Sequence, residues 1–190
     1  MEQTSVQKLA RVLRVMVMAA FVCNLIALMF VPLAADWWGW ERAAGWQPPL
    51  DGEESLPALW LRAVAYVWRQ PGPLSLALFL AFCGVCTAVI LWQGKRVLDT
   101  ILMGEPFSPD NAGNLKRAAV CCFLIAGAAL LRVVWGLVNY WNLYANVFEI
   151  TPIVNALFVP IFLMGGLLFM VMSALFRQAA ELKAENDLTI

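Results

Sequence analysis

The sequence QGKRVLDTILMGEPFSPDNAGNLKR, residues 93–117, forms a polar and basic bridge between two long apolar segments. Two hydrophobic runs precede the bridge and two follow it, and each is long enough to cross the hydrocarbon core of a bilayer, which is about 30 Å thick. Four basic residues lie close to the ends of the flanking runs: Lys95, Arg96, Lys116 and Arg117. Because basic residues favour the cytoplasmic side of a membrane, this bridge decides the topology.

The composition points to the same fold class. Hydrophobic residues make up 62% of the chain and charged residues 14%, and the mean hydropathy is +0.74. A soluble domain has an apolar share of only roughly 45–50%. We therefore predict an all-α fold, an integral membrane four-helix bundle in the lipid bilayer, with an additional interfacial helix in the first outer loop.

Charge and histidine content exclude several function classes. The 13 basic and 13 acidic residues leave no net charge, so the chain has no basic excess for direct contact with nucleic acid. The chain also has no histidine, the residue that binds haem and most zinc, di-iron and copper centres. We therefore expect no cofactor, no metal site and no Ser-His-Asp or Cys-His catalysis.

Four apolar runs give the predicted spans within a single membrane domain, residues 1–190. The spans lie at approximately 12–35, 74–92, 118–140 and 152–176, with a Trp-rich outer loop at 36–73, the bridge at 93–117 and a tail at 177–190. A cleaved signal peptide is the alternative for the first run, but the apolar core of such a peptide has only about 7–15 residues. Within the outer loop, apolar residues recur at spacings of three and four between 56 and 68, which predicts a helix lying in the outer leaflet. An aromatic pocket for a lipid or quinone is the alternative use of its tryptophans.

The distribution of basic residues predicts the orientation. Most of them lie at the N-terminus, in the bridge and in the tail, whereas the opposite side carries only Arg42, Arg62 and Arg69. We therefore expect a multi-pass protein of the bacterial inner membrane with both termini in the cytoplasm.

Three polar side chains in or near the spans are candidates for an intramembrane site: Asn24, Arg132 and Asn139. We expect Asn24 to hydrogen-bond to another helix, since an unpaired amide is costly in lipid. An arginine inside a membrane costs from about 2.5 to more than 10 kcal/mol, so Arg132 is the main candidate. Arg132 either extends to an interfacial acid or serves a transporter or lipid-binding site.

The second span contains the motif Cys83-Gly84-Val85-Cys86, whose CxxC spacing is typical of thiol redox enzymes. An apolar helix interior disfavours the thiolate that such chemistry needs, so packing is the favoured interpretation. Cys121 and Cys122 enter the third span at a depth that permits contact with Cys86. A membrane thiol oxidoreductase using Cys83 and Cys86 remains an alternative function.

Local signals also define the two ends of the bridge. Gly104 is expected to end the helix of the second span. Ser108 is expected to cap the next helix, with Pro109 in its first position and Asp110 in its first turn.

Three stretches carry a resemblance to a known family: the run from Gly104 to Asn111, the residues Leu115-Lys116-Arg117, and the ending from Phe176-Arg177 to Glu185-Asn186-Asp187-Leu188-Thr189-Ile190. Together they resemble the YoaS-like bacterial membrane proteins, a domain of unknown function. The resemblance is carried by the second half of the chain and does not extend to the Trp-rich loop or the cysteines. It implies four membrane helices and no established enzymatic activity, and the genes of such proteins often lie beside a gene for a small Xre-type helix-turn-helix regulator.

This setting suggests a non-catalytic sensor or anchoring partner for such a regulator. The candidate docking motif combines residues of the bridge and of the tail: Glu105, Pro106, Phe107, Ser108, Asp110, Asn111, Glu185, Asp187, Leu188 and Thr189.

Overall fold

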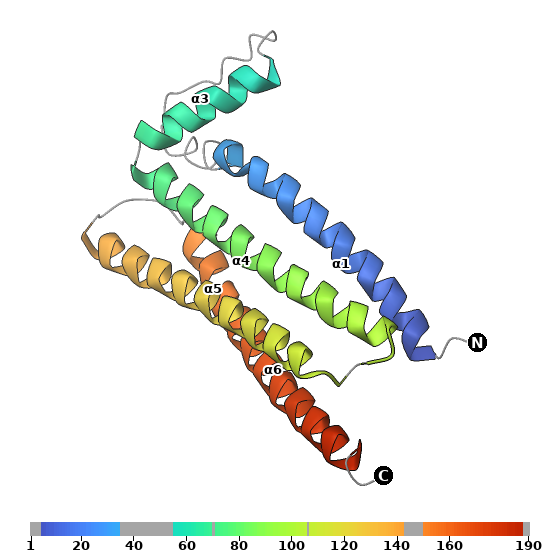
Figure 1. The fold of residues 1–190 in the computed structure, drawn as a ribbon. Coiled ribbons are helices and arrows are strands. Elements are labelled where there is room, and N and C mark those ends of the chain that lie inside the picture. Colours follow the sequence, from blue (N-terminus) through green and yellow to red (C-terminus); the bar gives the residue numbers. More distant parts are fainter. Residues whose placement is uncertain (1–4, 35–54, 70, 106, 143–149, 188–190) are drawn as a thin grey trace. The chain divides into compact units, whose positions relative to one another are not determined.

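The computed structural model describes residues 5–34, 55–69, 71–105, 107–142 and 150–187. All regular secondary structure in these residues is helical, and they contain no strand (Figure 1). The main helices are α1 (Ser5–Met29), α3 (Leu56–Arg69), α4 (Pro71–Leu102), α5 (Pro109–Asn142) and α6 (Ile150–Asp187). The predicted all-α fold is confirmed, and so is an additional helix between the first two long ones.

Four of these helices contain stretches long and apolar enough to cross a membrane, as predicted: Lys8–Met29, Leu74–Leu102, Pro109–Trp135 and Ala156–Asn186. Large apolar side chains on them are exposed, among them Met29 (71%) and Leu131 (72%). Water would make such surfaces costly, whereas lipid provides an apolar solvent for them. These features are those of a multi-pass membrane protein.

Two compact units make up the chain. One comprises Cys23–Val85, and the other comprises Met1–Val22 together with Cys86–Ile190. Helices α1 and α4 each contribute residues to both units.

The unit Cys23–Val85 joins its helices through two hydrogen bonds. The Asn24 side chain of α1 donates to the Gly84 carbonyl of α4 over 2.9 Å, which confirms the expected interhelical bond. The Trp60 indole of α3 donates to the Met29 carbonyl over 2.9 Å, and so satisfies a carbonyl at the end of α1. Helix α3 buries Ala63 and Val67 on one face. Its predicted position in the outer leaflet remains a prediction.

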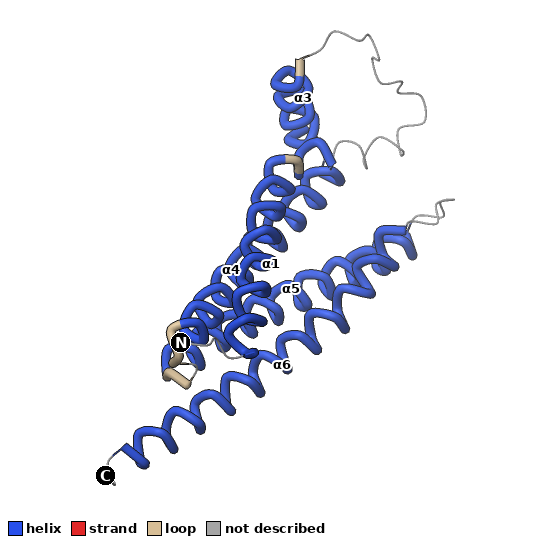
Figure 2. Tube along the Cα trace, turned by 90° about the vertical axis from the view of Figure 1, so that its right-hand side faces the viewer, coloured by secondary structure: helices blue, strands red, loops and turns tan. Residues whose placement is uncertain are grey.

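The second unit is built around the packing of α5 on α6, and both views show these helices close together (Figures 1 and 2). Helix α5 supplies most of the buried core residues, and many of them are small: Ala112, Ala118, Ala119, Cys122, Ala126 and Ala129. Small side chains allow helix backbones to approach closely in a membrane. Gly166 of α6 lies against the Phe123 ring, where an added Cβ would meet ring atoms at 2.9–3.1 Å. Ser173 of α6 donates to the Ala112 carbonyl over 2.7 Å.

Candidate functional site

The bridge begins where α4 ends at a glycine. Gly104 has a φ of +86°, a conformation that side chains disfavour. The Glu105 amide donates to the Thr100 carbonyl over 3.1 Å, and the Gly104 amide donates to the Ile101 carbonyl over 3.2 Å. This pair of bonds is the Schellman arrangement, which satisfies carbonyls at a helix C-terminus. The predicted helix end at Gly104 is confirmed.

The next helix begins as its local sequence predicts. The Asn111 amide donates to the Ser108 side-chain oxygen over 3.3 Å, so Ser108 caps α5. Pro109 is the first residue of α5, and Asp110 lies in its first turn. Pro106, which belongs to the predicted docking motif, lies outside the described residues.

The side chain of Asn111 faces the protein interior and is fully buried. Its amide group donates to the Thr100 hydroxyl over 2.6 Å, and that hydroxyl donates to the Val97 carbonyl over 2.8 Å. A buried amide with such partners fixes the end of α4 to the start of α5. Asn111 therefore positions the bridge, and its side chain is not offered to a docked protein.

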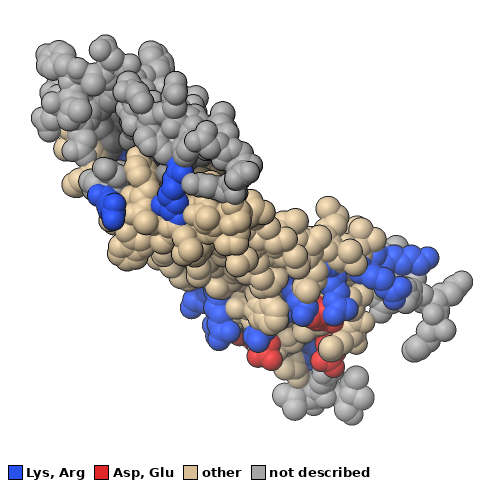
Figure 3. Space-filling model, turned by 90° about the horizontal axis from the view of Figure 1, so that it is seen from above, with Lys and Arg blue, Asp and Glu red and all other residues tan. Residues whose placement is uncertain are grey.

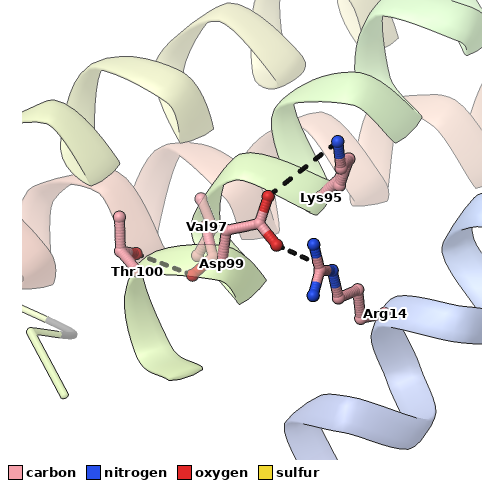
Figure 4. A network of polar contacts seen from close by, with 5 residues as sticks. All are labelled: Arg14, Lys95, Val97, Asp99 and Thr100. Atoms are coloured by element: carbon pink, nitrogen blue, oxygen red, sulfur yellow. Dashed lines mark hydrogen bonds and ion pairs between the residues drawn. The ribbon is translucent and has the colours of Figure 1, made fainter. Parts of the chain in front are cut away.

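An ion cluster lies beside this connection (Figure 4). Asp99 of α4 lies 2.8 Å from Nε of Arg14 on α1 and 4.0 Å from Nζ of Lys95 on α4. The Lys95 ammonium also lies 4.8 Å from the centroid of the Trp92 ring. The side chains of Lys95 and Asp99 are 23% and 24% exposed, and that of Arg14 is 46% exposed. We call Arg14, Lys95, Asp99, Thr100 and Asn111 the bridge cluster.

Sequence reasoning missed the contribution of Arg14 and Asp99 to this cluster. The pairing of Lys95 with Asp99 could have been predicted from the sequence, because the two residues stand four positions apart on a helix. The partner on α1 had no such signal, since 85 positions separate Arg14 from Asp99.

A second set of contacts links the bridge to α6. The rings of Phe107 and Phe176 lie with centroids 5.8 Å apart and planes inclined by 51°. Helix α6 continues to Asp187, and Arg177 pairs with Glu181 on it at 3.0 Å. All residues from Glu181 to Asn186 are exposed, including Glu185 of the predicted docking motif. The Asp187 side chain, Leu188 and Thr189 lie outside the described residues.

Charged side chains of both signs gather in this part of the second unit. Figure 3 shows acidic side chains lying next to basic ones, with uncharged surface adjoining them. The exposed members of the bridge and tail include Glu105, Asp110, Lys116, Arg117 and Lys183.

The predicted thiol pair Cys83 and Cys86 stays a prediction, and a further thiol lies close to Cys86. None of the five cysteines is in a disulfide, and the thiols of Cys86 on α4 and Cys121 on α5 lie close enough to interact. Cys122 lies near this pair and is buried. Among the described residues, no group of three or more His, Cys, Asp or Glu side chains is arranged to hold a metal ion.

The remaining intramembrane candidate is only partly described. Arg132 is half-buried within the candidate span of α5 and interacts with another group, so it is not an isolated charge. The Asn139 side chain lies outside the described part of the chain. An intramembrane site formed by Asn24, Arg132 and Asn139 stays a prediction.

The family described as "Protein of unknown function (DUF2975)" matches residues 2–190. The chain belongs to this family. No curated protein and no solved structure matches the chain. The family description assigns no activity, so the function of this DUF2975 protein has to be inferred from its geometry.

Among the described residues of this DUF2975 chain, the bridge cluster joins α1, α4 and α5, and the Phe107 and Phe176 contact joins the bridge to α6. The described residues of this region offer hydrogen bonds, ion pairs and exposed apolar side chains.

Proposed function

We propose that this protein is a non-catalytic membrane anchor that binds a small cytoplasmic helix-turn-helix regulator and holds it at the membrane. The proposal rests on one observation, the packing of Phe107 from the bridge against Phe176 of α6. Through this contact, residues far apart in the sequence contribute to one surface. Both segments carry the motifs on which the YoaS-like resemblance is based.

The bridge and tail also offer apolar groups that a partner would cover. Met103 is 80% exposed, Phe107 is 50% exposed, and Leu182 is 62% exposed. Four charged residues between Arg177 and Glu185 make the end of α6 too polar for hydrocarbon. Exposed apolar side chains on a polar, water-facing segment are typical of a protein interaction surface.

The length of α6 supports an extended docking arm. Residues 177–187 continue the helix past Phe176 by about 16 Å, at 1.5 Å per residue. An exposed helix with apolar side chains among charged ones can lie in a groove of a partner protein. In this proposal the bridge, the tail and both termini lie in the cytoplasm, and the protein is in the bacterial inner membrane.

The two other functions considered have less support. Cys86 lies close to Cys121 of α5, and an apolar helix interior disfavours the thiolate that a redox motif needs. Arg132 already interacts with another group, which favours a structural role over an open transport or lipid site.

Co-purification from native membranes tests the proposal. The wild-type protein, extracted in mild detergent, is expected to retain the regulator encoded by the neighbouring gene. Deletion of residues 185–190, or Phe107→Ala, should reduce the retained regulator at least tenfold, because each removes part of the composite surface.

Leu131→Ala is the matched control, because Leu131 is a large exposed apolar residue on the candidate span of α5. This variant should retain the regulator fully. Undiminished binding in both the deletion and the Phe107→Ala variant, with normal elution in detergent, would show that the bridge and tail are not the docking surface.

A further inference from the structure

The bridge cluster holds more positive charge than its own carboxylate neutralises. Arg14 and Lys95 both face Asp99, and the contact of Arg14 is made through Nε. A guanidinium has five N–H donors, and the contact through Nε uses only one of them. Nearly half of the Arg14 side chain is exposed, at 46%, so it can reach a further acceptor.

Other basic residues lie at the same end of this unit. The contacts of Arg14 with Asp99, and of Thr100 with Asn111, bring the start of α1, the end of α4 and the start of α5 together. The seven basic residues of these segments are Lys8, Arg11, Arg14, Lys95, Arg96, Lys116 and Arg117, and the three acidic ones are Asp99, Glu105 and Asp110. Seven minus three leaves an excess of four positive charges, which attracts anions.

The cluster lies near the ends of two spans predicted from the sequence. Arg14 stands two residues after the start of the predicted span 12–35, and Lys95 stands three residues after the end of the predicted span 74–92. Basic side chains at such positions can reach the level of the lipid headgroups. Trp92, beneath the Lys95 ammonium, is of the residue type that prefers the boundary between headgroups and hydrocarbon.

Apolar side chains next to Arg14 suit the acyl chains of the same ligand. Leu13, Val15 and Met16 are 40%, 65% and 62% exposed. A free phosphate ion would use the cations but not this apolar surface. An amphipathic anion uses both.

We propose that Arg14 and Lys95 bind the phosphate of an anionic phospholipid headgroup at the bridge end of this unit. Asp99 holds the two cations side by side and competes with the lipid phosphate for them. Lys8, Arg11 and Arg96, all exposed, add attraction for anionic lipid over a longer range.

Thermal unfolding in a neutral detergent with added lipid tests this site. Phosphatidylglycerol should raise the melting temperature of the wild-type protein more than the same amount of phosphatidylcholine, because a lipid that binds the folded state stabilises it. Arg14→Gln combined with Lys95→Gln should weaken phosphatidylglycerol binding by about tenfold or more. Asp99→Asn should strengthen it, because a competing carboxylate is lost.

Arg177→Gln combined with Lys183→Gln is the matched control, since it removes the same charge from the tail and should leave the lipid effect unchanged. The Asp99→Asn variant distinguishes lipid binding from a purely structural role of the cluster. If the role is purely structural, every substitution in the cluster should only destabilise the protein. The proposal is wrong if phosphatidylglycerol loses its effect on Asp99→Asn, or if the double variant of Arg14 and Lys95 responds like the wild type. An equal effect of soluble glycerol phosphate would assign the site to a free anion and also overturn it.

Discussion

Single residues have their greatest effect where two helices approach closely, and Gly84 is the clearest case. An added Cβ at Gly84 would overlap with Cδ2 of Leu28 and lie 2.9 Å from its Cγ. We expect Gly84→Ala to destabilise the protein by about 1–2 kcal/mol, since the cost of forcing the packed Leu28 side chain to shift exceeds the helix-propensity gain of about 0.5–1 kcal/mol. Combining it with Leu28→Ala should cost less than the sum of the two changes, because the methyl gains room.

Gly127→Ala provides the control, because a Cβ at that position meets nothing within 4 Å. In an open helix position this change should stabilise by about 0.5–1 kcal/mol. Unfolding in detergent, followed by helical circular dichroism, measures all four variants. Strict additivity of Gly84→Ala and Leu28→Ala would contradict the described contact.

The thiols give a second prediction at this scale. Mild oxidation of purified protein with diamide should link Cys86 to Cys121, because those two thiols lie close enough to interact. Mass spectrometry of the digested protein identifies the linked peptides. Cys23→Ser and Cys83→Ser should leave the crosslink in place, whereas Cys121→Ser should abolish it. A link between Cys83 and Cys86 instead would favour the redox motif read from the sequence.

At the scale of elements, the helix ends could be predicted from the sequence because local residues determine them. Gly104 and Ser108 act on their own backbone neighbours, so the end of α4 and the start of α5 could both be predicted from the sequence. The contact of Arg14 with Asp99, and that of Phe107 with Phe176, join distant positions. No periodicity of one sequence specifies such partners. The same reason explains why Asn111 was assigned to a surface although tertiary packing buries it.

The bridge makes a prediction about its helix end. Gly104→Ala should destabilise the protein by about 1 kcal/mol, because a φ of +86° disfavours a side chain even though the surrounding space is open. Gly94→Ala, within α4 and also without neighbours within 4 Å, should instead be neutral or stabilising. Denaturation of both variants in detergent measures the difference. Equal stability of the two would mean that the bridge relaxes without the left-handed residue.

For the whole molecule, the remaining question is which connectors face the cytoplasm. An even number of crossings places both termini on one side, and the four candidate spans provide it. Basic residues then choose the side, since nine of them lie at the N-terminus, in the bridge and in the tail, and three lie in the first connector: Arg42, Arg62 and Arg69. The basic excess around Arg14 and Lys95 would then meet the anionic lipids of the cytoplasmic leaflet.

Fusions to alkaline phosphatase, which is active only outside the cytoplasm, test this orientation. A fusion after Gly52 should be active, because that residue lies in the connector between the first two candidate spans. A fusion after Asn114 should be inactive, because the bridge charges favour the cytoplasm. The reverse pattern would show the opposite topology, with the proposed regulator surface outside the cytoplasm. Activity in both fusions would show that no membrane crossing separates Gly52 from Asn114. Only the predicted pattern allows Phe107, the tail of α6 and a cytoplasmic regulator to meet.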